Sequence, residues 1–387
     1  MTETIELDDI VGALTTIRRE IHAEPELGFK EHRTAGLIAS FLEDRGLEVH
    51  RGIGGTGVVG VLRMGTSQRS VGLRADMDAL GIQERTGLPY ASRNSGVFHG
   101  CGHDGHIVML LGAAAHLAKR RDLDGTVHFI FQPAEEGLGG AKAMIDEGLF
   151  ERFPCDRVFA LHNWPGLPAG VAGCRPGPIM AAADKFEIVL SGRGGHAALP
   201  HTTPDVLVAA SQLVLQLNTL VSRVIPPTAT AVLSVTQMSG GHAHNVIPAE
   251  VRIGGTVRTF DVTVQDLIES GLRRAVEGVT TMSGTTASIV YDRYYPATIN
   301  DSDAAKDALS AARTITSTQL LKEPAFTSED FSFMLQQRPG AYIWLGQGVG
   351  DGAPSLHAPT YDFNDDIIET GVRLHVALAA QTLGAGR

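Results

Sequence analysis

Apolar residues near the start of the chain recur every three or four positions, as they do on one face of a helix. The segment 8–22 has this spacing, and so does 34–45, which ends at Gly46. In the first of these segments the apolar positions are Ile10, Leu14, Ile17 and Ile21. Short β-branched runs then follow at 58–63 and 71–74, between glycine-rich turns. The pattern predicts two helices followed by strands.

Strand and helix alternate in the next part of the chain. Strands at 126–132 and 157–161 flank a helix at 141–147, and Asp104 can serve as the N-cap of an earlier helix that ends near Arg120. This alternation predicts an α/β layered domain with a mostly parallel central sheet. Ligands of such sheets bind beyond the carboxyl ends of the strands. Side chains suited to a site follow directly after apparent strand ends at Asp76, Asp78, Glu135, Glu136 and His162.

The pattern changes around Ala183 and returns near Pro296. Between these points the order of elements is strand, helix, strand, strand, helix, strand, at 185–190, 205–221, 229–237, 250–259, 263–280 and 287–291. This order predicts a small independent α+β domain with its helices on one face of a sheet. Helices at 302–315 and 365–382 and a strand at 341–345 then resume the α/β pattern. We therefore expect a larger domain formed by 1–183 and 296–387, with 184–295 inserted into it.

Composition narrows the class of protein. A chain of 387 residues, 43% apolar and 19% charged, suits a soluble protein of two domains. The net charge of −11 argues against nucleic acid or an anionic membrane as the main partner. Three cysteines argue against a disulfide framework. Because Met1–Glu6 is acidic and no apolar run approaches membrane-spanning length, we expect a cytoplasmic protein.

The segment Phe98–His106 concentrates reactive side chains. It holds a thiol, three imidazoles and a carboxylate, separated by three glycines. In an extended segment, residues two apart share a face, so Cys101 and His103 can bind one ion. Thiolate and imidazole are good ligands for first-row transition metals. Since a tight turn can have the same composition, this segment alone leaves metal binding open.

Further ligand types lie in other predicted loops. Together they give a set of five, Cys101, His103, Glu136, His162 and His357. Five ligands exceed what one tetrahedral zinc uses and suit two neighbouring ions. Glu135 can then act as general base and acid if a loop turns it toward the site together with Glu136. Two simpler interpretations remain: Glu135 and Glu136 only begin a helix, and Asp76 and Asp78 only cap the next segment.

Several short motifs appear in one order along nearly the whole chain. They are His22–Gly28, Leu73–Leu80, Cys101–His106, Gln132–Gly137, Gly194–Ala198, Asn245–Pro248, Ser328–Phe331 and Leu356–His357. With these motifs the chain resembles the hippurate hydrolases and N-acyl-amino-acid amidohydrolases, within the dinuclear metallopeptidases that include aminoacylase and carboxypeptidase G. Each motif is modest alone, and together they are highly specific.

The resemblance implies roles for residues of the larger, catalytic domain. It implies metal ligation by Cys101, His103, Glu136, His162 and His357, with Glu135 as the general base. Asp78 matches the acid that elsewhere in the family orients a metal-binding histidine, and Asp76 occupies the place of that histidine. We therefore expect both aspartates to support the ligands rather than to bind metal.

The inserted domain resembles the family's lid, which also forms the dimer. By this similarity, His196 reaches the active site of a partner subunit and stabilises the oxyanion of the tetrahedral intermediate. Asn245 and Arg258 match residues that hold the substrate carboxylate. Without the resemblance, His196 is better described as a polar turn residue and Arg258 as a charge at a strand edge.

The sequence thus predicts a metal-dependent amidohydrolase that cleaves N-acyl or N-aroyl amino acids. We expect two divalent ions per subunit (zinc, manganese, cobalt or nickel), a small-molecule substrate, and a homodimer or higher oligomer formed through the lid. A dipeptidase or carboxypeptidase on the same scaffold is the alternative. A cysteine hydrolase with Cys101 as nucleophile is disfavoured, because His103 is too near in sequence to serve as its base. A non-catalytic binding protein is disfavoured because no residue of the predicted site is missing.

Overall fold

The computed structural model describes residues 7–120, 122–348 and 354–384, and the predicted acidic N-terminus Met1–Glu6 lies outside them. The chain forms two compact units. Unit 1 comprises Met1–Ile179, Thr298–Glu323 and Asp330–Arg387, and unit 2 comprises Met180–Ala297 and Pro324–Glu329. These boundaries differ by a few residues from the predicted ones after 183 and 295. The second segment of unit 2 was not predicted from the sequence.

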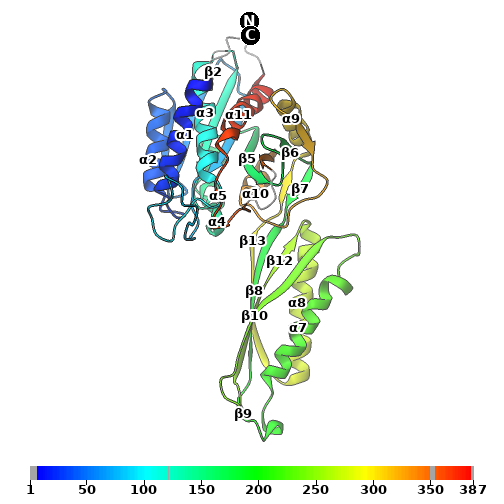
Figure 1. The fold of residues 1–387 in the computed structure, drawn as a ribbon. Helices are drawn as coiled ribbons and strands as arrows, with labels where there is room; N and C mark the ends of the chain where they lie inside the picture. The colour runs from blue at the N-terminus through cyan, green and yellow to red at the C-terminus, as the bar shows by residue number, and fades with distance from the viewer. Residues whose placement is uncertain (1–6, 121, 349–353, 385–387) are drawn as a thin grey trace. The chain divides into compact units, whose positions relative to one another are not determined.

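A large sheet organises unit 1 (Figure 1). Within the described residues its eight strands lie in the order β1 (Glu48–Ile53), β2 (Gly57–Met64), β4 (Gly125–Gln132), β3 (Ser70–Asp76), β5 (Arg157–Pro165), β16 (Gly340–Gly348), β6 (Ala172–Cys174) and β15 (Thr318–Leu320). Neighbours are parallel from β4 through β3 and β5 to β16, and again between β6 and β15. The other neighbouring pairs are antiparallel. The predicted α/β class with a mostly parallel sheet is confirmed.

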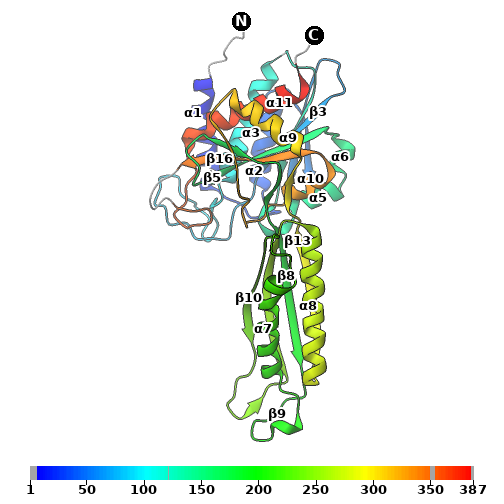
Figure 2. The same ribbon diagram turned by 90° about the vertical axis from the view of Figure 1, so that its right-hand side faces the viewer.

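Helices cover both faces of this sheet (Figure 2). One face carries α1 (Leu7–Ala23), α2 (His32–Glu43), α3 (His103–Lys119), α9 (Ser302–Arg313) and α11 (Ile368–Leu383). The other carries α5 (Gly140–Asp146) and α10 (Phe331–Gln337), with α6 (Leu149–Arg152) packed on α5. The shorter elements are α4 (Glu135–Leu138), β7 (Gly177–Met180), β14 (Thr298–Asn300) and the 3₁₀ turn η2 (Asp365–Ile367).

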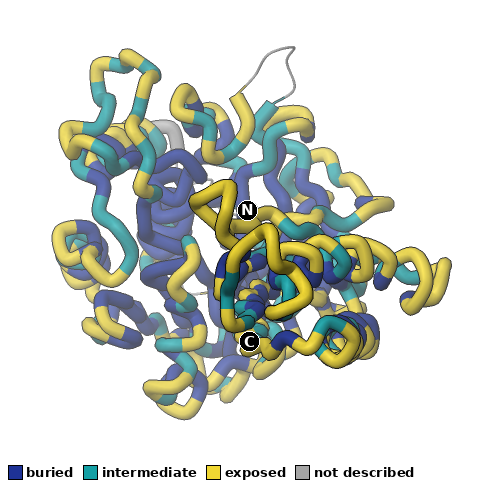
Figure 3. Tube along the Cα trace, turned by 90° about the horizontal axis from the view of Figure 1, so that it is seen from below, coloured by how far each residue is buried: buried dark blue, intermediate teal, exposed yellow. Residues whose placement is uncertain are grey.

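Helix α3 is the most buried helix of unit 1. It packs against α1, α11 and β3, and its residues from His103 to Ala115 are all buried. A helix that is apolar on nearly all sides belongs in the interior. Figure 3 shows such buried positions gathered inside the molecule and exposed ones along the outer turns. Because α3 begins with His103, a rigid core helix positions a predicted ligand.

The predicted N-cap of α3 is wrong. The helix begins at His103, and the capping position belongs to Gly102, whose φ of 88° is left-handed. The Asp104 carboxylate instead binds two side chains of α1, with its Oδ2 2.8 Å from His22 Nδ1 and 3.0 Å from Arg18 Nη1. Burial disfavours the charged imidazole, but hydrogen bonds with Asp104 and Glu84 outweigh burial and raise the pKa of His22 to about 9. This buried network joins α1 to the start of α3.

A second buried histidine makes the folded state sensitive to acid. His128 of β4 is 3% exposed, and burial together with Arg63 lowers its pKa from 6.5 to about 4. The unfolded chain therefore binds this proton more readily than the folded chain between these pH values. We expect the free energy of unfolding to fall by about 3 kcal/mol as pH drops from 6.5 to about 4, with no contribution above 6.5.

Urea unfolding of His128→Gln across this pH range measures the effect, since glutamine does not titrate. The variant should lose about 3 kcal/mol of the wild-type pH dependence over this range, whereas His32→Gln at an exposed position should keep it. Equal pH dependence in His128→Gln and wild type would contradict the assignment.

Unit 2 has the predicted α+β order. Within the described residues its four-stranded antiparallel sheet runs β10 (Ala231–Ser239), β12 (Glu250–Thr259), β8 (Ala182–Ser191) and β13 (Thr286–Tyr295). Both α7 (Val206–Arg223) and α8 (Val262–Ser283) pack on one face of it, and their N-terminal amides bond to the Asp205 and Asp261 side chains. The short elements are β9 (Gly195–His196), β11 (Val246–Ile247) and the 3₁₀ turn η1 (Pro200–Thr202).

By length and composition alone, α7 could cross a membrane, although the sequence prediction found no run of that length. A single such helix is weak support, because core helices of soluble proteins meet the same criterion. In unit 2 the buried side of α7 belongs to the core above the sheet. Its buried residues recur at helical spacing, as Val206, Ala209, Ala210, Leu213, Leu217 and Leu220.

Candidate metal centre and active site

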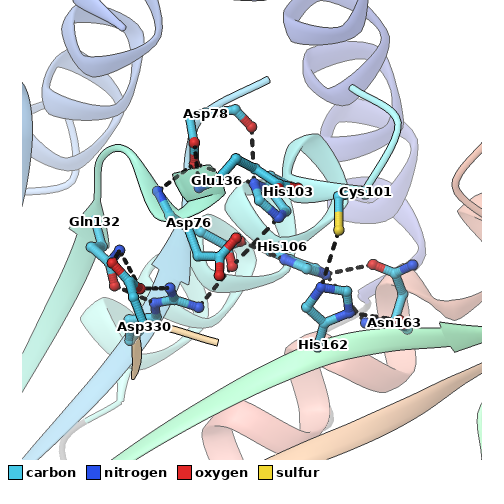
Figure 4. Close-up of polar contacts among 12 residues, drawn as sticks. Asp76, Asp78, Cys101, His103, His106, Gln132, Glu136, His162, Asn163 and Asp330 are labelled. Carbon is cyan, nitrogen blue, oxygen red and sulfur yellow. Dashed lines mark hydrogen bonds and ion pairs between the residues drawn. The ribbon is translucent and has the colours of Figure 1, made fainter. Parts of the chain in front are cut away.

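Five predicted ligands converge in unit 1, and Figure 4 labels four of them, Cys101, His103, Glu136 and His162. Their potential ligand atoms form two groups, each with all atoms within 4.8 Å of one another. One group is Cys101, His103 and His162, and the other is Cys101, Glu136 and His357. Because Cys101 belongs to both groups, its sulfur could help to hold a cation at either of them. The structure brings the five side chains together, and their binding of metal stays a prediction.

The ligands come from four different parts of unit 1. Cys101 precedes α3, Glu136 lies in α4, and His357 follows β16, while His162 lies inside β5 and not beyond its end as predicted. Cys101 and His103 meet through a turn and not through the extended segment that was predicted. At Gly102 the backbone is left-handed, and a Cβ there would lie 2.6 Å from Asn163 Oδ1. Only glycine fits this position.

The donor set and its charge fit divalent cations. Burial, Glu136 and Glu135 all raise the pKa of the Cys101 thiol, because carboxylates surround it. Burial disfavours the charged form of His103, but Asp76 and Asp78 outweigh it and raise the pKa of His103 to about 10. This concentration of negative charge would be compensated by bound cations. Mixed nitrogen, oxygen and sulfur donors suit zinc, manganese, cobalt or nickel.

The orientation of His103 also suits a ligand. Its Nδ1 donates to the carbonyl oxygen of Asp78 at 2.9 Å. Its Nε2 is buried, makes no hydrogen bond within the described part of the chain, and lies 3.7 Å from Asp76 Oδ2. A histidine ligand is commonly held in this way, with one nitrogen donating to a backbone oxygen while the other faces the metal.

Glu135 and Glu136 begin the short helix α4, as the simpler interpretation held, but its backbone is distorted. Ala134 before them is left-handed with φ 53°, and Glu136 has a non-helical ψ of 73°. The Asp78 carboxylate accepts hydrogen bonds from the backbone N–H of Glu135 at 3.0 Å and of Glu136 at 2.9 Å. Asp78 therefore orients both glutamates at the start of α4, whereas the simpler interpretation had it cap the segment that directly follows it.

Glu31 supports the same turn and was not predicted. Its Oε1 accepts a hydrogen bond from the Ala134 N–H at 2.8 Å, and its Oε2 accepts one from Thr56 Oγ1 at 2.5 Å. Burial raises the pKa of Glu31. A buried carboxylate thus holds the strained residue directly before Glu135. A single acid in an early loop gives no sequence signal for this contact.

We expect Asp78→Ala to lower kcat about 10- to 100-fold, because it frees the two amides that aim Glu135 and Glu136. Steady-state kinetics on an N-acyl amino acid, with metal content measured in parallel, checks this. Asp78→Asn keeps one acceptor oxygen and should lose less. Asp146→Asn changes an exposed acid of α5 and serves as the control. Unchanged kcat in Asp78→Ala would contradict the positioning role.

Asp76 also contacts charged neighbours. Its Oδ2 lies 2.7 Å from Arg74 Nη1, and its Oδ1 lies 2.5 Å from His106 Nδ1. Burial opposes ionisation, but His103, Arg74 and His106 outweigh it and hold the pKa of Asp76 well below its usual value. The other nitrogen of His106 lies 2.6 Å from Asn163 Oδ1. Both nitrogens of His106 are therefore engaged, and the sequence did not reveal this role.

The remaining predicted residues belong to unit 2. His196 is exposed in β9 and pairs with Val246 of β11, directly after Asn245. The Ala197 N–H donates to the Asn245 carbonyl at 3.0 Å, so this contact holds His196 and Asn245 close together. Arg258 is half-buried in β12, where its Nη1 donates to Thr256 Oγ1 and to the Val257 carbonyl. Arg258 forms no ion pair with another described residue, and its guanidinium can still bind a carboxylate.

Comparison with known proteins shows the family to which this chain is similar. The sequence model described as Peptidase family M20/M25/M40 matches residues 72–381. The chain is 40% identical over 381 residues to a hippurate hydrolase of Campylobacter jejuni, covering 98% of both chains. It is 36% identical over 372 residues to an N-acetylcysteine deacetylase of Bacillus subtilis, covering 96% of this chain and 97% of that protein.

A solved structure of a similar protein has the same fold as this chain. The Bacillus subtilis YXEP protein, described as a dinuclear metal binding peptidase from the M20 family, is 33% identical to this chain. The comparison covers 97% of this chain and 99% of that one, with a TM-score of 0.86.

Proposed function

Because the chain belongs to the peptidase family M20/M25/M40, we propose that it is a metal-dependent amidohydrolase that cleaves the amide bond of N-acyl amino acids such as hippurate. One observation carries this function. Two groups of ligand atoms share Cys101, and Glu135 lies beside them within 4.8 Å of the ligand atoms of His103 and Glu136. This arrangement combines a dinuclear cation site with a carboxylate that can move a proton.

Two divalent cations held by the five ligands would supply Lewis acidity toward the amide carbonyl and the attacking water. Glu135 accepts a proton from that water as the water oxygen bonds to the carbonyl carbon. Glu135 then gives the proton to the amide nitrogen as the C–N bond breaks, which releases a carboxylate and a free amino acid. His196 donates a hydrogen bond to the oxyanion, and Asn245 and Arg258 hold the carboxylate of the amino acid.

A cysteine hydrolase remains a weaker alternative. Cys101 Sγ lies 3.4 Å from His162 Nε2, so histidine contact alone does not argue against it. A nucleophilic cysteine, however, needs surroundings that lower its thiol pKa. Burial and two neighbouring glutamates raise the pKa of Cys101 instead. Those carboxylates suit a cation site better than a thiolate nucleophile.

Chelation separates the two mechanisms. Release of free amino acid from hippurate and N-acetyl amino acids should stop in chelated protein and return when zinc, manganese, cobalt or nickel is added. Chelated protein that remains as active as metal-loaded protein would favour the cysteine hydrolase. Activity on dipeptides alone would leave the metal centre in place and move the substrate to the dipeptidase class.

We also propose that the protein acts in the cytoplasm as a homodimer formed through unit 2. Three free, buried cysteines suit a reducing compartment, and Leu215 on α7 is 70% exposed, as an interface residue can be in a single subunit. Cell fractionation tests the location, and light scattering coupled to gel filtration tests the dimer.

Mixing two inactive variants tests whether His196 serves the partner subunit. In a dimer of Glu135→Gln with His196→Ala, one active site combines an intact Glu135 with His196 from the other subunit. Restored activity after mixing and exchange supports this trans arrangement. Continued inactivity, with heterodimer formation verified, would place His196 in its own subunit's site.

A further inference from the structure

Both tryptophans of the chain lie together beside a predicted metal ligand. Trp164 follows His162 by two residues in β5, and Trp344 is the register partner of His162 in β16. The two indole rings stack with centroids 3.8 Å apart and an interplanar angle of 2°. The His162 and Trp164 ring centroids are 6.2 Å apart, and the rings meet edge to face at 72°. A flat aromatic surface therefore lies directly beside the metal centre.

Packing alone does not explain this pair. Trp344 is 5% exposed, and its Nε1 is buried and makes no hydrogen bond within the described residues. A buried donor without an acceptor is costly, so an ordinary core position would favour phenylalanine. Trp164 is only partly buried, although it is among the largest apolar side chains. Partly open aromatic rings at a site bind other rings by stacking and edge contacts.

We propose that Trp164 and Trp344 form the wall that binds an aromatic acyl group of the substrate. This inference rests on the proposed amidohydrolase function. The acyl group is bonded directly to the carbonyl carbon under attack, so it must lie next to the metal ligands. Asn245 and Arg258 are assigned to the amino-acid carboxylate at the other end of the substrate. The Trp164–Trp344 pair, beside His162, is then the surface that the acyl group meets.

A benzoyl group can stack on an indole ring, whereas an acetyl group offers little surface to it. The protein should therefore prefer hippurate over N-acetylglycine, since these substrates share glycine and differ only in the acyl group. We expect kcat/KM for hippurate to exceed that for N-acetylglycine about tenfold or more. Trp164→Leu should lower this ratio about fivefold, the range of a lost aromatic pair. Trp164→Phe should retain most of it.

The control for loss of an aromatic side chain is Phe153→Leu. Phe153 is buried in unit 1, where its ring neighbours are His50 and His128. The ratio should be unchanged in this variant. N-acetylphenylalanine tests the competing assignment, in which the tryptophans bind the side chain of the amino acid. If Trp164→Leu changes the preference for N-acetylphenylalanine over N-acetylglycine and leaves the benzoyl preference intact, the proposal is wrong.

Intrinsic fluorescence gives a readout that does not depend on turnover. Because the chain has two tryptophans and both lie here, its indole emission reports on this site alone. Hippurate should change the emission of metal-loaded Glu135→Gln protein in a saturable way, and N-acetylglycine should not. Benzoate should act like hippurate on the wild-type protein. When Trp164→Leu is added to the Glu135→Gln protein, hippurate should no longer change the emission of the remaining Trp344.

The two readouts distinguish failure of this inference from failure of the proposed function. Suppose that the wild-type protein hydrolyses hippurate, but that Trp164→Leu alters neither the ratio of kcat/KM for hippurate to that for N-acetylglycine nor the fluorescence response to hippurate. Only the aromatic wall is then refuted. If no N-acyl amino acid is hydrolysed with any metal, the proposed function fails. In that case a saturable benzoate signal that depends on Trp164 still supports an aromatic carboxylate site, and its absence refutes both.

Discussion

Replacing Glu135 by glutamine is expected to lower kcat on hippurate about 10³- to 10⁴-fold while the metal ions remain bound. Glutamine has nearly the size of glutamate and makes the same backbone contacts, but it cannot carry a proton. The Glu135 N–H would still donate to Asp78, so the turn should be kept. Steady-state kinetics together with metal analysis by mass spectrometry measures both parts of the expectation.

Glu136→Gln is the matched control for this variant. It removes one charge from the neighbouring residue, which belongs to the ligand group of Cys101 and His357. We expect Glu136→Gln to lose activity together with bound metal, whereas Glu135→Gln loses activity alone. Full metal content with normal kcat in Glu135→Gln would rule out Glu135 as the proton carrier.

Replacing Cys101 by alanine is expected to remove both metal ions and to reduce activity to the background level. Cys101 is the one residue common to the two groups of ligand atoms, so its loss weakens both at once. His357 belongs to only one group. His357→Ala should therefore lose about one ion per subunit and keep the other. Metal content per subunit, measured after dialysis, gives the direct comparison.

Cys155→Ala controls for the loss of a buried thiol. Cys155 is 5% exposed, lies in the turn between α6 and β5, and belongs to neither group of ligand atoms. This variant should keep both ions. If Cys101→Ala lost only one ion, Cys101 would serve only one of the two ligand groups.

The parts of the fold with strong periodicity could be predicted from the sequence. The long helices α1, α7 and α8 and the order of elements in unit 2 follow from apolar spacing. Strand β1 was missed, because all but one of its residues are exposed or only partly buried and they show no apolar alternation. Strands β6 and β15 have three residues each, and a run of that length has no readable period.

The site was predictable where chemistry is concentrated in short motifs, and not where it depends on distant partners. Cys101 and His103 stand out because thiol and imidazole lie two residues apart. Asp104 was misassigned, because a local rule suggested a cap while its partner Arg18 lies 86 residues away. His106 likewise depends on Asn163, 57 residues away. Long-range ion pairs and hydrogen bonds between core elements leave no periodic signal in a single sequence.

The strand order of unit 1 has a consequence for synthesis of the chain. In the finished sheet, β5 lies between β3 and β16, but β16 begins about 175 residues after β5 ends. At a ribosome speed of roughly 5 to 20 residues per second, synthesis of the intervening residues takes about 10 to 35 s, and β5 lacks this neighbour for that time. During that time one edge of an apolar strand can pair with other chains. The nascent protein is therefore most exposed to aggregation while unit 2 is being made, and a chaperone that covers β5 would act in that interval.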